Sequence, residues 1–218
     1  NGDAGINVTG AENVTVTSST VVENEIWNVH FEQVSNGTVR SVNASAAMAD
    51  KSYGFHANAS ANLTVADSQF LGNDHTGVAL EATDDSRLAN VTASHNGEYG
   101  IELDQYWYPA PVLNESNNNR IVDSTVVDND WHGIVITDSA NNTILNNTET
   151  DHSRTGNLRQ TADTVDPQGF ESPTIVENIT VTDNTLRNND EGIRLTGDAR
   201  AQDDEVSGSV RNVTLRNN

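Results

Sequence analysis

Short stretches of alternating apolar and polar residues recur along the chain at similar intervals. Four-residue segments open with Gly or Asn and carry apolar side chains one and three positions later, as in GFHA at 54–57, GVAL at 77–80 and GIEL at 100–103. A side-chain period of two predicts a β-strand whose alternate residues face a core. The pattern therefore predicts many short strands, each with one buried face.

The spacing of these segments indicates a repeat. They open at Gly5, Asn28, Gly54, Gly77, Gly100, Gly133 and Gly192, with successive spacings of 23, 26, 23, 23, 33 and 59 residues. The last spacing divides at Gly156 into 23 and 36 residues, although GNLR at that position lacks the apolar pair. Strands this short bury their apolar face only when successive rungs stack, so self-similarity near 23 residues predicts a solenoid of about eight rungs.

A second set of positions repeats in step with the first. Four residues before each opener stand Asn1, Asn24, Asp50, Asn73, Asn96, Asn129, His152 and Asn188. We expect the amide side chains of this column to stack about 4.8 Å apart and to satisfy each other's hydrogen bonds. Gly at the opener is expected to allow a tight corner with positive φ, and Asn28 is the residue next best suited to it.

This repeat of Gly openers and preceding Asn residues resembles the parallel β-helix repeat family, which includes pectate-lyase-like and NosD-like archaeal surface proteins. The resemblance covers essentially the whole chain and implies an all-β fold, a right-handed parallel β-helix solenoid. We expect residues 1–218 to form a single domain, either a segment of a longer protein or a subunit that associates end to end. Insertions near 105–117, 157–173 and 197–209 are expected to leave from one corner of the rung.

The charge of the chain bears on its habitat and partners. It holds 32 acidic and 11 basic residues, a net charge of −21, and Lys51 is its one lysine. Such an acidic surface resembles those of haloarchaeal proteins. In molar salt the screening length falls to about 3 Å, and the repulsion between the acidic side chains largely disappears.

Other partners and settings are disfavoured by the sequence. The lack of a basic stripe argues against nucleic acid as a partner, and no apolar run is long enough to cross a bilayer. With no cysteine, the chain has neither disulfides nor thiolate metal sites.

Asn-x-Ser/Thr triplets are frequent and suggest an extracellular or cell-surface glycoprotein. They begin at Asn7, Asn13, Asn36, Asn43, Asn58, Asn62, Asn90, Asn114, Asn141, Asn146, Asn178 and Asn212. A repeat built from Asn, Val and Thr also produces such triplets without any glycan. Both interpretations remain open at this point.

A concentration of aromatic residues gives the best functional clue, since aromatics make up only 5% of the chain. The predicted ligand-binding residues are Glu102, Asp104, Tyr106, Trp107, Tyr108, Trp131 and His132. Aromatic faces beside carboxylates suit sugar rings, which offer C–H faces for stacking and hydroxyls for hydrogen bonds. The partner expected here is therefore a glycan or polysaccharide. The alternatives are a local aromatic cluster and an oligomer contact.

Catalysis is the rival interpretation. The segment KSYGFHANAS at 51–60 resembles the Tyr-Gly-Phe-Asp-Pro-His motif of alginate C5-epimerases, so the candidate catalytic residues are Lys51, Tyr53 and His56. His56 stands where the family has Asp, and Asn58 stands where it has His, so both acid–base positions differ. Pectate-lyase-like chemistry would instead need calcium, which Glu81, Glu102 and Asp104 on neighbouring rungs could bind through oxygen.

Two hypotheses follow from the sequence. The first is a secreted, halophilic β-helix module without catalytic activity that binds glycans or serves adhesion or structural display. The second is a polysaccharide lyase, epimerase or glycoside hydrolase that acts beside the 105–117 insertion. A carboxylate and a basic residue or histidine converging within hydrogen-bond reach would favour the enzyme.

Overall fold

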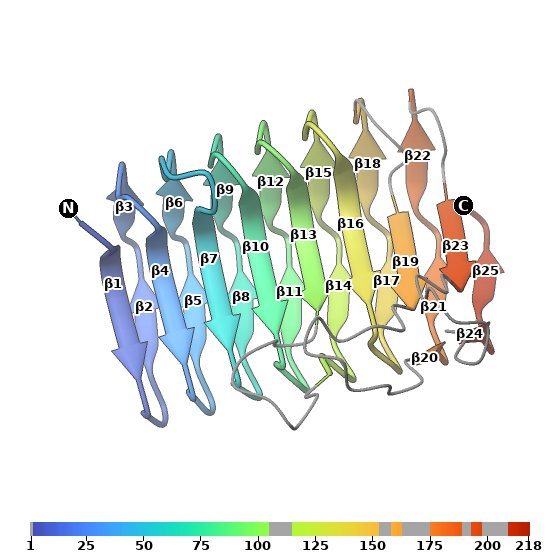
Figure 1. Ribbon diagram of the computed structural model, residues 1–218, viewed down its shortest axis with the longest axis horizontal. Coiled ribbons are helices and arrows are strands. Elements are labelled where there is room, and N and C mark those ends of the chain that lie inside the picture. Colours follow the sequence, from blue (N-terminus) through green and yellow to red (C-terminus); the bar gives the residue numbers. More distant parts are fainter. Residues whose placement is uncertain (1, 105–114, 153–157, 163–174, 189–192, 198–208) are drawn as a thin grey trace, which may run out of the picture.

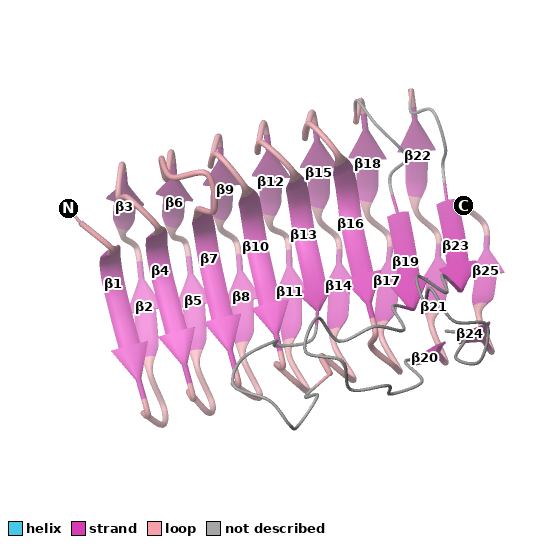
Figure 2. Cartoon of the chain, viewed as in Figure 1, coloured by secondary structure: helices cyan, strands magenta, loops and turns pink. Residues whose placement is uncertain are grey.

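The computed structural model describes residues 2–104, 115–152, 158–162, 175–188, 193–197 and 209–218. Strands and turns account for these residues (Figure 2), and no helix suited to crossing a membrane is found in this part of the chain. The strands coil into stacked rungs, and the stack runs along the long axis of the molecule (Figure 1). The predicted all-β parallel β-helix is confirmed.

Three parallel sheets form the walls of the coil. The first sheet contains β1 (Ala4–Thr9), β4 (Trp27–Glu32), β7 (Tyr53–Asn58), β10 (Thr76–Glu81), β13 (Tyr99–Asp104), β16 (His132–Thr137), β19 (Leu158–Ala162) and β23 (Ile193–Gly197). The second contains β2 (Thr15–Thr17), β5 (Thr38–Arg40), β8 (Thr64–Ala66), β11 (Arg87–Ala89), β14 (Arg120–Val122), β17 (Thr143–Leu145), β21 (Thr180–Thr182) and β25 (Thr214–Arg216). The third contains β3 (Thr20–Val22), β6 (Asn43–Ser45), β9 (Gln69–Leu71), β12 (Thr92–Ser94), β15 (Thr125–Val127), β18 (Thr148–Thr150) and β22 (Thr185–Arg187), and β20 (Ile175–Glu177) pairs with β24 (Ser209–Arg211). Neighbouring strands in each sheet come from successive rungs, so the eight strands of the first sheet correspond to the eight rungs expected.

Aliphatic and aromatic side chains of successive rungs stack inside the coil. One column of paired residues in the first sheet consists of Val29, Phe55, Val78, Ile101, Ile134, Leu158 and Ile193. Its first five members are completely buried. Burial of one such side chain contributes about 1.5 to 3 kcal/mol to stability. The predicted core is therefore correct, and Ile101 does lie against Ile134.

The rungs bend at single residues in the left-handed region. One column of them precedes the second sheet and has φ values of 52 to 59°: Asn13, Asn36, Asn62, Asp85, Asn118, Asn141, Asn178 and Asn212. Asn and Asp tolerate this conformation because their short side chains hydrogen-bond locally. The residue two positions later is often a strand-opening Thr, as at Thr15 of β2 and Thr143 of β17. Turn and strand together thus produce six of the Asn-x-Thr triplets, and glycosylation stays a prediction.

Buried asparagine amides form the predicted ladder. Asn73 Nδ2 donates to Asn96 Oδ1, and Asn96 Nδ2 donates to Asn129 Oδ1, both at 2.9 Å. The same oxygens accept main-chain N–H groups of Asn73 at 3.1 Å and Asn96 at 3.0 Å. His152 extends the ladder, because its Nδ1 accepts the N–H of Asn129 at 3.2 Å. The side chains satisfy main-chain donors that the corner would otherwise bury without partners.

The ladder position of Asp50 was predicted wrongly. Asp50 is exposed, and the N–H of Ala47 donates to Asn73 Oδ1 at 3.1 Å in its place. Asn28 bridges the rung, since its Nδ2 donates to Asn73 Oδ1 at 3.1 Å and its Oδ1 accepts from Asn24 Nδ2 at 2.7 Å. The three additional residues of the 26-residue rung displace Asp50 from the column.

The glycine openers serve packing and do not provide positive φ. Among the described glycines, positive φ occurs at Gly10 and Gly72 and at none of the openers. A Cβ on Gly54 would lie 2.6 Å from the Gly77 carbonyl oxygen and 2.7 Å from that of Ala44. The prediction of a positive-φ corner is therefore wrong: the openers are glycine because neighbouring rungs leave no room for a side chain.

The rung near Gly156 is shifted by one residue from the predicted register. Leu158 pairs with Ile134 and Gln160 with Ile136, so the strand register is one residue later than GNLR suggested. Residues 158–162 form β19, so the predicted 157–173 insertion overlaps a strand. The strands β13, β19 and β23 all belong to the first sheet. Most of each predicted insertion lies outside the described residues, so their common exit corner stays a prediction.

Candidate functional site

Aromatic side chains gather on the outer face of the first sheet from β4 to β16. We call this set the ring array: Trp27, His30, Tyr53, His56, His75, Tyr99, Trp131 and His132. Most come from two columns, one at the first residue of each strand and one at the fourth. Register pairing places Trp27 beside Tyr53 and His30 beside His56. The rings therefore lie on consecutive rungs of one wall.

The rings contact one another without a gap. Trp27 stacks on His30 with centroids 4.4 Å apart, His30 on His56 at 5.1 Å, and His56 on Tyr53 at 4.8 Å. Tyr53 and His75 are 5.4 Å apart, and His75 meets the edge of Tyr99 at 6.0 Å.

Tyr99 completes the array. Its ring stacks on His132 at 5.8 Å and meets Trp131 edge-on at the same distance. Spacings between 4.5 and 7 Å are those of interacting aromatic pairs.

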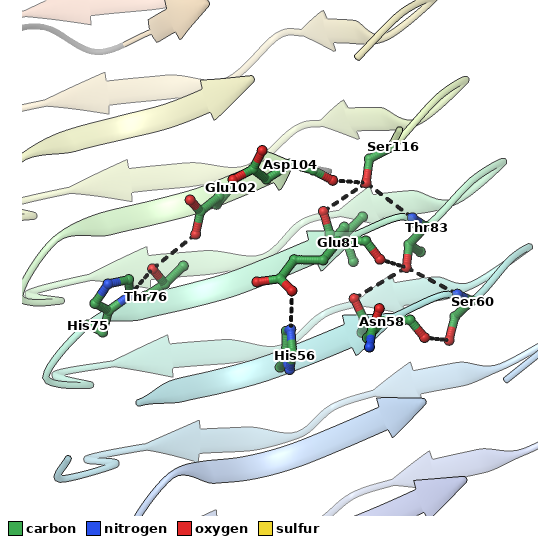
Figure 3. Close-up of polar contacts among 12 residues, drawn as sticks. His56, Asn58, Ser60, His75, Thr76, Glu81, Thr83, Glu102, Asp104 and Ser116 are labelled. Carbon is green, nitrogen blue, oxygen red and sulfur yellow. Dashed lines mark hydrogen bonds and ion pairs between the residues drawn. The ribbon is translucent and has the colours of Figure 1, made fainter. Parts of the chain in front are cut away.

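Carboxylates stand between and beside the rings. Glu81, Glu98, Glu102 and Asp104 together with the ring array form what we call the aromatic–acidic face. Glu81 Oε2 lies 3.3 Å from His56 Nε2 (Figure 3), and Glu98 Oε2 lies 3.0 Å from His75 Nε2. The first pair joins β7 to β10, and the second joins the turns that precede β10 and β13.

A chain of polar contacts orients Glu102. His75 Nδ1 lies 2.8 Å from Thr76 Oγ1, and Thr76 Oγ1 donates to Glu102 Oε2 at 3.4 Å (Figure 3). Thr76 is completely buried, whereas the side chains of His75 and Glu98 are partly exposed. The chain links Glu102 in the middle of the face to Glu98 at its edge.

Burial and mutual repulsion control the charges of this face. Desolvation, followed by the charges of Glu81 and Glu98, raises the pKa of Glu102 to about 8. Desolvation and the neighbouring His56 lower the pKa of His30 to about 4, so this ring is neutral at pH 7. Desolvation also lowers the pKa of His75 and raises that of Tyr53, whose phenol therefore stays protonated.

Several buried polar atoms of this region have no hydrogen-bond partner among the described residues. They are Trp27 Nε1, Ser52 Oγ, His56 Nδ1 and Asn58 Oδ1, whereas His56 Nε2 faces the Glu81 carboxylate. His56 and Asn58 are only 6% and 5% exposed. Buried polar groups normally find partners, so a concentration of unsatisfied atoms on and beside two neighbouring strands indicates a place where a ligand or water binds.

The structure brings together some of the residues predicted to bind ligand. Glu102 belongs to the aromatic–acidic face, and Asp104 pairs with Glu81 in register. Trp131 and His132 both contact Tyr99. The three predicted aromatic residues Tyr106, Trp107 and Tyr108 lie outside the described residues.

The candidate catalytic residues are close together. Tyr53 stacks on His56, and the charge of Lys51 is close enough to lower the pKa of His75. Glu81, Glu102 and Asp104 occupy neighbouring strands, as expected for the calcium hypothesis. Within the described ranges, however, no three acidic or histidine side chains stand close enough together to hold a metal ion.

Sequence reasoning missed the column that begins each strand. Trp27, Tyr53, Tyr99 and His132 all occupy the residue before the opener, and Thr76 holds the same position on β10. Alignment of the repeat on its openers would have shown this column. Contacts between the rings at the first and fourth strand positions depend on side-chain rotamers, which the repeat pattern does not predict.

A separate open groove of about 560 Å³ follows the ends of β4, β7 and β10. Its lining includes Asp84 and Glu115, and desolvation raises the pKa of both carboxyl groups. Asp84 Oδ1 accepts the N–H of Asn117 at 2.7 Å. The described lining contains no aromatic side chain, so the aromatic–acidic face is the better candidate for sugar binding.

Sequence comparison gives the family. The model of the family described as "Right handed beta helix region" matches residues 4–166. The chain belongs to the right-handed β-helix family. A search of curated proteins gives no match.

Solved structures of other β-helix proteins resemble this one. The periplasmic alginate epimerase AlgG is 16% identical with a TM-score of 0.71, and the match covers 98% of this chain and 48% of that one. The A-module of the Azotobacter vinelandii mannuronan C-5 epimerase AlgE4 is 13% identical with a TM-score of 0.67, over 94% of this chain and 54% of that one. The enzymatically active domain of bacteriophage CBA120 tailspike protein 2 is 12% identical with a TM-score of 0.50, over 86% and 27%. Such identities show a shared β-helix fold, and this chain spans about half the length of the two epimerases.

Proposed function

We propose that this β-helix protein binds a polysaccharide along the aromatic–acidic face. The observation that carries the proposal is the unbroken ring array over β4, β7, β10, β13 and β16. Sugar rings stack their C–H faces on aromatic side chains, and strands about 4.8 Å apart repeat at nearly the length of one sugar unit. Two of the similar structures carry the names of alginate and mannuronan epimerases, which supports a polysaccharide ligand.

Tyr99→Ala is expected to weaken glycan binding about tenfold, or about 1.4 kcal/mol. Tyr99 contacts His75, Trp131 and His132, so its loss divides the array into two parts. A glycan array in high salt would select a binding oligosaccharide, and calorimetry with and without calcium would give its dissociation constant. Comparison of the titrations with and without calcium tests the predicted calcium site at Glu81, Glu102 and Asp104.

Two variants control this experiment. Tyr99→Phe keeps the ring and is expected to retain binding, and Thr148→Ala alters an exposed residue of the third sheet. If Tyr99→Ala binds as tightly as the parent protein, or if no glycan binds at all, the proposal is wrong.

A polysaccharide lyase, epimerase or glycoside hydrolase is the second candidate. The stacking of Tyr53 on His56, with Lys51 nearby, places an acid, an imidazole and a cation together. Glu102 has the raised pKa of a general acid, with Glu81 beside it. The excess of carboxylates on the face disfavours anionic uronate chains, so we place binding first. Release of unsaturated, epimerised or shortened products would establish the enzyme, and Tyr53→Phe and His56→Ala would then abolish that product.

We also propose that the protein acts outside the cell, at its surface, in high salt. The net charge of −21 supports this setting. Circular dichroism is expected to show β structure in molar NaCl and its loss on desalting. An unchanged spectrum and unchanged thermal stability in low salt would remove the halophilic part of the proposal. End-to-end association stays a prediction, which sedimentation in the same buffers would test.

A further inference from the structure

Among the described residues, the aromatic–acidic face carries more acidic than basic side chains. The strands β4, β7, β10 and β13 contain no Lys or Arg, and Lys51 lies just before β7. His30 and His75 do not compensate, because desolvation lowers the pKa of both. Along the column of residues in register with Glu102, the next basic residues are Arg159 and Arg194, which lie two and three strands beyond β13.

Two carboxyl groups come together at the centre of this region. The charge of Glu81 contributes to the raised pKa of Glu102 on the next strand. The contact of Glu81 with His56 joins it to an imidazole, which carries a full charge only when protonated. Because Glu102 keeps its proton at any pH below its pKa of about 8, the attraction of this region for a cation comes from Glu81 and not from a pair of charged carboxylates.

An unsatisfied acceptor stands beside these carboxylates. Asn58 is 5% exposed, and its Oδ1 receives no hydrogen bond from the described residues. Asn58 pairs with Glu81 in register, and Figure 3 shows the two side chains on adjacent strands of the face. An ammonium group has three donors and no acceptor, so Asn58 Oδ1 and the Glu81 carboxylate are both acceptors of the kind that it needs.

An ammonium group fits this place better than a metal ion does. In the described parts of the chain, no three acidic or histidine side chains converge as metal ligands, whereas an amine needs only two acceptors and gains from adjacent rings. Cations bind the faces of Trp and Tyr, and Tyr53 and Trp27 lie on the same two strands as His56 and His30. The same surface therefore offers stacking to a sugar ring and charge to its amino substituent.

We propose that the aromatic–acidic face binds a polysaccharide of amino sugars whose amino groups are free and protonated, with one ammonium group between Asn58 and Glu81. This proposal rests on the glycan-binding function proposed above and specifies its ligand class. Glu81 contributes charge, Asn58 contributes a neutral acceptor, and the ring array contributes the stacking surface.

Two oligosaccharides of equal length and linkage test the proposal: β-1,4-linked glucosamine and its N-acetylated form. Calorimetry is carried out at mildly acidic pH, where the amino groups are protonated, at low and high ionic strength. The free amine is expected to bind about tenfold more tightly, as a charge-assisted hydrogen bond predicts. Glu81→Gln should reduce this preference to about twofold.

Glu12→Gln is the matched control, because it removes the same charge from an exposed residue at a different corner of the rung. An equal loss of preference in this variant would show general attraction to an acidic protein and overturn the proposal. Equal or tighter binding of the N-acetylated oligomer, or preference for an oligomer of mannuronate, would overturn it while leaving glycan binding in place. If none of the three oligomers binds and the glycan array is also empty, both proposals fail.

Discussion

Glu149→Leu is expected to stabilise the protein by about 2 to 4 kcal/mol at mildly alkaline pH. Glu149 lies inside the coil on β18, paired with Val126 of β15 and Leu186 of β22. It is completely buried, and neither of its carboxyl oxygens has a hydrogen-bond partner in the described part of the chain. Leucine would fill the site without a group that must either ionise in a dry core or stay protonated.

The pH dependence of this effect has a defined sign. Burial raises the pKa of Glu149 well above its usual value, so the folded protein holds the proton that the unfolded chain releases near pH 4.3. The stability associated with the protonated carboxyl is complete below that pH and is lost as the pH rises toward the folded-state pKa. Urea unfolding at several pH values should therefore show a gap between Glu149→Leu and the parent protein that widens with pH. Parallel pH curves for the two proteins would contradict this, and Glu149→Gln should follow the flatter curve of the leucine variant.

Asn96→Ala is expected to destabilise the protein by about 3 to 5 kcal/mol. Asn96 Oδ1 accepts from the main-chain N–H and the side-chain Nδ2 of Asn73, and its own Nδ2 donates to Asn129 Oδ1 and to the Phe70 carbonyl oxygen at 3.2 Å. Alanine leaves both Asn73 donors and the Phe70 oxygen buried without these partners. Urea denaturation would measure the difference in the free energy of unfolding.

An exposed asparagine provides the control. Asn90 has φ of 52°, and its Nδ2 donates to Asp67 Oδ1 at the surface at 2.9 Å. Asn90→Gly keeps the left-handed conformation accessible and should change stability by less than about 1 kcal/mol. Similar losses for the two variants would mean that burial of the ladder does not determine its contribution.

The repeat pattern was sufficient to predict the coil and its interior. Ile101 and Ile134 follow from alternation alone, and Asn73, Asn96 and Asn129 follow from their constant offset before the opener. Both features depend on positions that recur once per rung, and an in-register parallel stack turns such recurrence directly into contact. Gly54 was located correctly and explained wrongly, because the closeness of neighbouring rungs is a property of three-dimensional packing.

The candidate site was predicted only in part. Glu102, Trp131 and His132 were named as candidate ligand-binding residues and lie on one face of the coil, whereas the role of Trp27 and His75 in the ring array was not recognised. His75 lies outside the strand and enters the array through its contacts with Tyr53 and Tyr99. Such contacts depend on side-chain direction at a corner, which no period in the sequence determines.

In-register pairing places the strands of the first sheet at a constant spacing along the coil. Each strand advances the wall by the same step, so under the proposed function the number of rungs that carry rings sets how many sugar units the face holds at once. Duplicating a 23-residue rung such as 77–99 would lengthen the first sheet by one strand, while the cross-section of the coil stayed the same. Selection for the length of a bound chain could therefore act simply through gain and loss of whole rungs.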